Sequence, residues 1–514
     1  MIGGGINGAA IARDAALRGL SVALVDRGDF AGATSSHSSK LIHGGLRYLP
    51  QGQIRLVYHA LRERERLRRV TAPHLVRPVR FLFPFYAGRR PGRLAVSAGL
   101  VLYDLFARTP PAERNQRLSR EAVRTLEAGL EVYGLRGGAL YYDGSGDDAR
   151  LTIENILDVV MHGGTVINYA EVEGFAYREG RITSAMVRDR ESGKPIELRA
   201  RCFVNAAGPW LDRIRLMDDP AAQPSMCLTK GVHLVVSAAH LQVNHALVLS
   251  DDCGRLVFVM PHGGWTLIGT TDTAYHGAPQ QVAVESEDAN YLIGVVNQAL
   301  PEARLALKDV AYSFAGLRVL PADDGGQAPS AIAREEVINE SASGLISVGG
   351  GKLTSHRAIG EQIAGMVLVR LGRGSGPSPS RMLPLPGARP LASEIAHSDA
   401  ERELWRARYP WLEGRYGSRA AIVAELAANA RERTELRERL AADAPAVGAE
   451  VVFAVRYEWA RTVSDFLIRR TAMAWRDPPA AIASAAAVGT IMAAELGWDQ
   501  AKMAAEVAAF LGGN

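Results

Sequence analysis

The chain of 514 residues carries a net charge of +4 and is 47% hydrophobic and 22% charged, a composition typical of a soluble globular protein with two or three domains. Its three cysteines, Cys202, Cys227 and Cys253, are scattered, which argues against a disulfide framework or a metal site. Because no secretory leader and no long, strongly apolar run is found, we expect a cytoplasmic location.

The chain begins with a glycine pattern typical of dinucleotide-binding folds, Gly3-x-Gly5-x-x-Gly8. Such glycines allow a tight turn, a close approach of the backbone to a pyrophosphate, and close packing of the following helix. Residues 9–19 are predicted to form that helix, and residues 20–26 a strand that ends on Asp26, where a ribose hydroxyl would bind. Only Met1 and Ile2 represent the strand before Gly3, so we expect the natural start a few residues upstream.

An arginine-rich region follows this first unit. Residues 62–93 contain ten arginines against Glu63 and Glu65, and apolar runs follow at residues 81–86 and 94–106. Two interpretations are open: a surface that lies on an anionic membrane, or a solvated helix followed by a core strand. No recognised nucleic-acid-binding module accompanies the charge, so we expect no nucleic acid as a partner.

Four glycine- or serine-rich elements, at residues 3–8, 33–45, 205–210 and 349–354, lie at the ends of predicted strands. They are far apart in the chain and would converge only in an interrupted nucleotide-binding domain, where ligands bind at the carboxyl ends of the strands. Strand-like runs between residues 233 and 269 predict a separate antiparallel sheet.

The second of these elements is part of the most specific string in the chain, residues 33–49, which reads ATSSHSSKLIHGGLRYL. With the motifs quoted next, it resembles the membrane-associated, FAD-dependent glycerol-3-phosphate dehydrogenases of the D-amino-acid-oxidase-like flavoprotein superfamily. The resemblance covers nearly the full length. Its other motifs are NAAGPW at 205–210, KGVH at 230–233, IGTTD at 268–272, GLRVL at 316–320, AIAR at 331–334, GGGKLT at 349–354 and the stretch 457–471.

The resemblance implies an interrupted Rossmann-like FAD-binding domain, an antiparallel-sheet substrate domain and an all-helical C-terminal domain. It further implies oxidation of sn-glycerol 3-phosphate to dihydroxyacetone phosphate, with electrons passed to membrane quinone by an enzyme peripherally associated with the cytoplasmic membrane, and a possible homodimer. The expected ranges are 1–75, 147–215 and 335–371 for the FAD-binding domain, 76–146 and 216–334 for the substrate domain, 372–390 for a linker and 391–514 for the helical domain.

FAD is expected to bind without a covalent link, because no cysteine lies beside a flavin element. By resemblance, Val172 contacts the adenine side through its backbone. The helix that starts near Gly351 would stabilise negative charge on the reduced flavin. The residues expected to contact FAD are Gly3, Gly5, Asn7, Gly8, Asp26, Thr34, Ser35, Ser38, Ser39, His43, Gly44, Gly45, Val172, Ala206, Gly208, Gly351, Lys352, Leu353 and Thr354.

A phosphorylated alcohol requires cations and a base. The cations expected to bind the phosphate, together with Tyr48, lie in the resembling motifs. We expect His43 or His233 to accept the hydroxyl proton, since histidine titrates near neutrality, with His262 and Arg318 as weaker alternatives and Arg318 better suited to stabilise an alkoxide. The expected substrate-binding residues are Arg47, Tyr48, Arg318, Arg334 and Lys352.

Three alternatives remain open at this point. The protein could be a glycerol-3-phosphate oxidase that uses oxygen, or an amine or amino-acid oxidase of the same superfamily. It could also be a non-catalytic protein whose shortened N-terminus binds FAD poorly.

Overall fold

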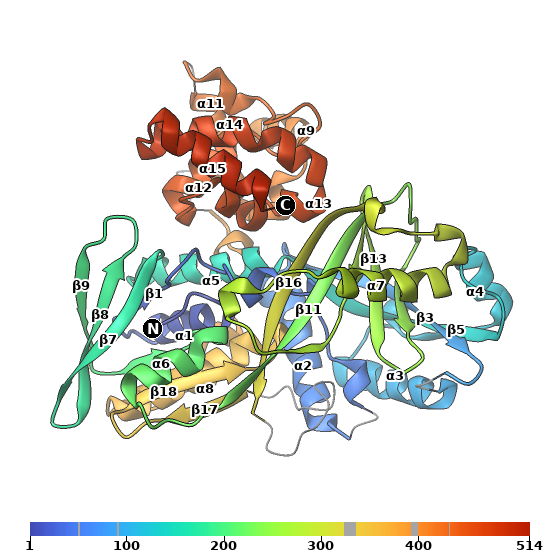
Figure 1. Ribbon diagram of the computed structural model, residues 1–514, viewed down its shortest axis with the longest axis horizontal. Coiled ribbons are helices and arrows are strands. Elements are labelled where there is room, and N and C mark those ends of the chain that lie inside the picture. The colour runs from blue at the N-terminus through green and yellow to red at the C-terminus, as the bar shows by residue number, and fades with distance from the viewer. Residues whose placement is uncertain (50–51, 90–91, 323–335, 392–398, 431, 514) are drawn as a thin grey trace.

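The computed structural model describes the chain except for residues 50–51, 90–91, 323–335, 392–398, 431 and 514. The described residues form an α/β unit, a large, mostly antiparallel sheet beside it, and a group of C-terminal helices that lies against both (Figure 1).

The α/β unit is centred on short parallel strands. β1 (Ala23–Val25) pairs with β6 (Thr165–Ile167), and β10 (Phe203–Asn205) pairs with β18 (Leu345–Gly350). Ile2 forms parallel bridges with both Val25 and Asn205, so the residue before the glycine turn joins the two pairs. The other elements of the unit are α1 (Ile6–Leu17), α5 (Asp148–Met161), α6 (Leu211–Asp218), α8 (His356–Arg370), β17 (Glu336–Glu340) and the antiparallel strands β7 (Ala170–Arg178), β8 (Arg181–Asp189) and β9 (Pro195–Arg199).

The turn between Ile2 and α1 brings backbone against backbone. Gly3 has a φ of +103°, and a Cβ at this position would lie 2.5 Å from the carbonyl oxygen of Ala206. A Cβ at Gly8, in the first turns of α1, would lie 1.9 Å from the carbonyl oxygen of Gly3. Side chains at these positions are therefore incompatible with the observed packing. The helix predicted over residues 9–19 is observed slightly earlier, directly after Gly5.

The predicted antiparallel sheet is larger than the sequence indicated. Its strands follow the order β15-β11-β14-β13-β12-β3-β5-β2, with β16 paired to β11 and β4 paired to β5. The pair β12–β3 is parallel, and the others are antiparallel. The strands are β2 (Leu41–Ile42), β3 (Val76–Tyr86), β4 (Gln116–Leu118), β5 (Leu135–Gly146), β11 (Met226–Ser237), β12 (Ala246–Ser250), β13 (Leu256–His262), β14 (Trp265–Gly269), β15 (Thr273–Tyr275) and β16 (Val310–Pro321).

Both faces of this sheet are covered, which explains its long apolar strands. Neighbouring residues point to opposite faces. Leu234 packs in a core with α7 (Ser286–Ala299), whereas Val235 packs in a core with α2 (Ile54–Arg66) and α3 (Arg93–Ala107). The short helix α4 (Arg120–Leu126) contributes Val123 to the first of these cores.

The C-terminal helices share one core. α14 is long and apolar enough to cross a membrane by length and composition, and 44% of its apolar window is buried inside the protein. Its alanines pack closely against α12 and α15, as expected for small residues. The helices are α9 (Asp399–Arg408), α10 (Leu412–Tyr416), α11 (Ala420–Asn429), α12 (Gly448–Glu458), α13 (Met473–Arg476), α14 (Pro478–Leu496) and α15 (Gln500–Gly512).

We predict that Gly8→Ala lowers the free energy of unfolding by about 1–3 kcal/mol, because the new methyl group collides with backbone that has no space to move. The control is Gly294→Ala in the exposed middle of α7, where a Cβ meets no atom within 4 Å. There the change should raise stability by up to about 1 kcal/mol, since alanine favours helix over glycine. Chemical denaturation followed by circular dichroism measures both, and equal effects would contradict the packing described.

Candidate active site

A cavity of about 680 Å³ lies where the α/β unit meets the large sheet, within the size range of small-molecule sites. Residues from all four glycine- and serine-rich elements line it, so elements far apart in the sequence converge as expected. The predicted FAD-contacting residues that line it are Gly3, Gly5, Asn7, Asp26, Thr34, Ser35, Ser38, Ser39, His43, Val172, Ala206, Gly208, Gly351, Lys352, Leu353 and Thr354.

The first turn of α1 faces this cavity through Gly5, Ile6 and Asn7. The Ile6 amide donates to Ser35 Oγ at 2.9 Å, and Asn7 Nδ2 donates to the Gly350 carbonyl at 3.1 Å. These bonds tie the first, second and fourth elements together. A helix N-terminus at a glycine turn suits a phosphate group, so the residues present fit a dinucleotide such as FAD.

The Asp26 carboxylate at the end of β1 also lines the cavity. It accepts hydrogen bonds from the backbone amides of Gly4, at 2.6 Å, and Gly28, at 2.8 Å. Burial raises the pKa of the Asp26 carboxyl to about 6, although both amides favour its charged form. Asp26 therefore fixes the glycine turn against the following loop, in addition to any contact with a ribose.

A buried ion pair, which the sequence did not predict, fixes the serine-rich loop of the second element. Lys40 Nζ lies 2.7 Å from Asp148 Oδ1, and both side chains are almost fully buried. Asp148 Oδ2 also accepts from the amide and the hydroxyl of Ser38, at 3.1 and 2.7 Å, while Thr34 Oγ1 donates to the Leu317 carbonyl at 2.6 Å. These hydroxyls position the loop. The available sequence signal was the acidic start of α5, which indicated only a helix N-terminus.

Three predicted cofactor residues, Gly8, Gly44 and Gly45, are not among the described residues that line the cavity. The Gly44 amide instead donates to the hydroxyl of Tyr103 at 2.8 Å, and that hydroxyl donates to Asp143 at 2.6 Å. Asp143 pairs with Arg64 at 2.7 Å. Through Arg64 of α2 and Tyr103 of α3, these buried contacts connect both helices to Gly44 in the second element.

Two of the predicted cations line the cavity. Arg318 Nη2 donates to Thr270 Oγ1 at 2.8 Å, and Nη1 donates to Asp272 at 3.2 Å. Its guanidinium lies over Gly231, where a Cβ would come within 2.4 Å of Nη2. Lys352 also lines the cavity, and its Nζ lies 4.0 Å from the ring centroid of Tyr48.

The remaining predicted cations lie outside the described part of the chain. Residue Arg334 is in the range 323–335, and the side chain of Arg47, in the helical turn Leu46–Tyr48, is likewise not described.

His43 and His233, the two preferred bases, both line the cavity. His233 Nε2 lies 2.9 Å from Ser39 Oγ, and its ring stacks on Phe314 with centroids 4.8 Å apart. Burial, with Arg318 and Lys40 nearby, holds the pKa of His233 well below 6.5, so the imidazole is neutral.

His262, the weaker alternative, is not among the described lining residues. Its ring packs edge-on against Trp475 at 5.0 Å, and burial lowers its pKa to about 3.

Comparison with known proteins identifies the family. Residues 1–366 match the FAD dependent oxidoreductase family, and residues 378–503 match the C-terminal domain of alpha-glycerophosphate oxidase. The glycerol-3-phosphate dehydrogenase of Synechocystis sp. is 36% identical over 97% of this chain and 93% of its own length. The chain belongs to the FAD-dependent glycerol-3-phosphate dehydrogenase family. The aerobic glycerol-3-phosphate dehydrogenase of Bacillus subtilis is 34% identical over 92% of this chain and 86% of its own length.

Solved structures agree with this family. The glycerol-3-phosphate dehydrogenase from Bacillus halodurans, complexed with FAD, superimposes with a TM-score of 0.80 at 29% identity, covering 99% of this chain and 93% of that one. L-alpha-glycerophosphate oxidase from Mycoplasma pneumoniae, with FAD bound, has a TM-score of 0.57 at 18% identity and covers 75% of this chain and 97% of that one, which shows the common fold. The predicted fold class and the predicted cofactor, FAD, are confirmed.

His356, the first residue of α8, follows the fourth element closely in the chain. It is 2% exposed, and its Nδ1 lies 2.7 Å from the Leu353 carbonyl oxygen. Burial lowers its pKa to about 4. In the unfolded chain His356 takes up a proton below about pH 6.5, whereas in the folded protein it does so only below about pH 4. The free energy of unfolding should therefore fall by about 1.4 kcal/mol per pH unit as the pH drops between these values.

We therefore predict that His356→Asn, which keeps a donor near the position of Nδ1, reduces the pH dependence of stability over this interval by about 1.4 kcal/mol per pH unit. Urea denaturation of both proteins at about pH 7 and about pH 5 measures the difference. The same slope in the two proteins would show that His356 is not held neutral by the fold.

Proposed function

We propose that the protein oxidises sn-glycerol 3-phosphate to dihydroxyacetone phosphate in this cavity and passes the electrons to membrane quinone. The observation that carries the proposal is that Arg318 and Lys352 line the same cavity as the glycine elements of the FAD site. Relatives that are 33–36% identical over most of the chain are named for this substrate. An amine, which is cationic at neutral pH, or a zwitterionic amino acid would have less need for two cations than a phosphate dianion.

FAD, when bound, supplies the acceptor for the hydride that leaves the carbon bearing the secondary hydroxyl. The residues of this chain bind and orient the substrate. Arg318, fixed by Thr270 and Asp272, presents a rigid guanidinium that suits bidentate contact with a phosphate. Lys352, in the fourth element, supplies a second cation to the same cavity.

A neutral histidine takes the hydroxyl proton as the hydride leaves. Both His43 and His233 line the cavity, and each remains a candidate. Burial and the charges of Arg318 and Lys40 lower the pKa of His233, which makes its imidazole a weaker proton acceptor than an ordinary histidine. Ser39 Oγ, 2.9 Å from His233 Nε2, is the first group that could relay a proton taken up there.

We predict that Arg318→Gln and Lys352→Gln each raise the KM for sn-glycerol 3-phosphate about 10- to 100-fold, since charge-assisted hydrogen bonds contribute about 1.5–3 kcal/mol. The matched control, Arg456→Gln, removes a guanidinium that pairs with Glu495 among the C-terminal helices and should leave KM unchanged. Steady-state kinetics with FAD content measured in parallel separate substrate binding from cofactor loss. Unchanged KM in both cavity variants would favour the amine or amino-acid oxidase alternative.

The electron acceptor is a separate part of the proposal. A dehydrogenase should reduce a soluble quinone analogue and release little peroxide with the same substrate, whereas an oxidase should release peroxide in proportion to substrate oxidised. Measuring both products in one preparation distinguishes the two.

Contact with an anionic membrane surface is proposed on the basis of the outer surfaces of α2 and α3. This membrane face consists of apolar side chains that remain exposed, among them Leu94 at 80% and Leu105 at 68%. Basic side chains Arg55, Arg93 and Arg108 are exposed beside them. The two helices lie on the opposite side of the molecule from the C-terminal helices (Figure 1). The apolar side chains of this membrane face are Ile54, Tyr58, Leu94, Val101, Leu102 and Leu105.

We predict that the double substitution Leu94→Asp, Leu105→Asp weakens binding to vesicles of anionic phospholipid about tenfold or more, because two apolar anchors are lost and like charge is added. Val369→Asp on α8, where Val369 is 62% exposed, is the control. Co-sedimentation with vesicles measures the partition. Equal binding of all three proteins would exclude this face as the membrane contact.

A further inference from the structure

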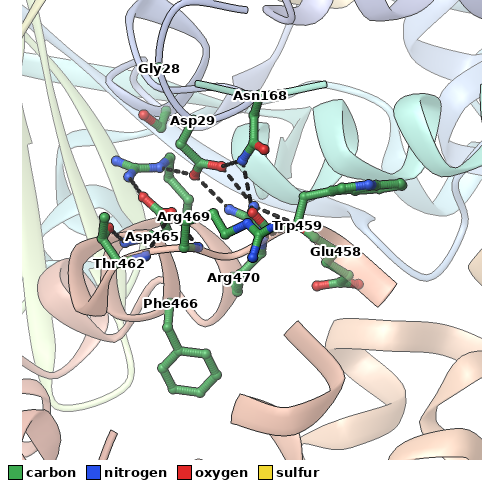
Figure 2. Close-up of polar contacts among 12 residues, drawn as sticks. Gly28, Asp29, Asn168, Glu458, Trp459, Thr462, Asp465, Phe466, Arg469 and Arg470 are labelled. Atoms are coloured by element: carbon green, nitrogen blue, oxygen red, sulfur yellow. Dashed lines mark hydrogen bonds and ion pairs between the residues drawn. The ribbon is translucent and has the colours of Figure 1, made fainter. Parts of the chain in front are cut away.

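The C-terminal helices meet the α/β unit at a buried network of charges (Figure 2). Two of its members, Asp29 and Arg469, line the cavity described above. The centre of the network is Asp29, on the loop that follows Asp26. Asp29 accepts a hydrogen bond from Arg469 Nε and two from Arg470, at 2.7 and 2.8 Å. Both arginines belong to the π-helical segment Asp465–Arg470 of the C-terminal part, some 440 residues away in the chain.

The same C-terminal segment also contacts the connection between β6 and β7, which consists of Asn168 and Tyr169. The Asp465 carboxylate accepts from the Tyr169 hydroxyl at 2.8 Å, and Arg469 Nη2 donates to the same carboxylate. The Tyr169 amide in turn donates to the Gly28 carbonyl at 2.9 Å. Asn168 Nδ2 donates a further hydrogen bond to the Trp459 carbonyl at 2.8 Å. Both residues of the β6–β7 connection are therefore bonded to the C-terminal part.

The loop that carries Asp29, residues 26–29, is part of the cofactor site. Asp26, Arg27, Gly28 and Asp29 all line the cavity, and so does Arg469, although it comes from the C-terminal part. By contrast, Arg470 is fully buried and is not among the described lining residues.

The network is balanced in charge and enclosed, with Asp29, Asp465 and Arg470 at most 1% exposed. Two carboxylates face two guanidinium groups. Removing one member while the others stay buried would leave a charge without a partner, which is strongly unfavourable. The docked C-terminal segment and the loop at Asp29 therefore depend on each other.

We propose that the C-terminal helical domain is a component of the cofactor site, such that its docking on Asp29 and the binding of FAD favour each other. Arg469 forms part of the cavity wall, and Arg470 holds the loop in the conformation that lines the site. By thermodynamic reciprocity, if docking raises the affinity for FAD, FAD must stabilise docking by the same factor. This inference depends on FAD binding alone and is independent of the substrate and the electron acceptor.

The first test uses the unmodified full-length protein. Hydrogen–deuterium exchange is measured with and without FAD for peptides from residues 459–470, and for peptides from α15 as a reference for global stabilisation. Coupling predicts that FAD slows exchange in 459–470 about tenfold or more beyond any change in α15, corresponding to about 1.4 kcal/mol. Equal changes in the two regions, or none, would overturn the proposal.

The second test uses Arg470→Gln, because this residue acts on the cavity only through Asp29 and the docked segment. Titration of the apoprotein with FAD, followed by flavin fluorescence, should give a Kd raised about tenfold or more, with partial recovery in Arg470→Lys. Arg456→Gln, which breaks an exposed ion pair within the C-terminal domain, should leave the Kd unchanged. A folded Arg470→Gln protein with an unchanged Kd contradicts the proposal, and if this variant does not fold, the exchange experiment decides alone.

Discussion

The site depends on one close approach of backbone to backbone. Gly3 lies against the carbonyl of Ala206, and Gly8 lies against the carbonyl of Gly3, at distances that leave no space for a Cβ. This contact joins the start of the chain to β10 and sets the first turn of α1 at the cavity. The bonds from Ile6 to Ser35 and from Asn7 to Gly350 then bring the other elements into position. The cofactor site is thus assembled from distant segments around a single turn.

The large sheet completes the site from the other side. Its strands alternate between two faces, and β11 turns Gly231 and His233 toward the cavity while Val232 and Leu234 pack in the core on the other face. Gly231 leaves the space that the Arg318 guanidinium occupies. In the proposed reaction, phosphate recognition and proton acceptance would come from the sheet and from Lys352, whereas the glycine elements of the α/β unit would hold FAD. A fold can carry different substrate sites in this way, since function depends on the residues of the site.

The sequence predicted the motifs well and the contacts between them poorly. Glycine spacing and strand ends were sufficient to predict the four converging elements, whereas Arg318 and Lys352, which line the cavity, were predicted from the family resemblance. No local pattern indicated that Tyr103 would support the Gly44 amide, or that Asp29 would bind Arg469 and Arg470. Such pairs join isolated polar residues across long stretches of chain, and neither periodicity nor spacing records them. The sequence placed Met1 and Ile2 in a strand before Gly3, but the strands that Ile2 joins became visible only through its bridges to Val25 and Asn205.

The proposed reaction requires bound FAD and the cavity cations to act together on a phosphorylated alcohol. The most direct measurement is anaerobic titration of the purified, FAD-loaded protein, followed by the visible absorbance of oxidised flavin. We expect bleaching by one equivalent of sn-glycerol 3-phosphate per flavin and no bleaching by glycerol at the same concentration, because glycerol lacks the phosphate that Arg318 and Lys352 would bind. Equal bleaching by both alcohols, or bleaching only by an amine or amino acid, would contradict it.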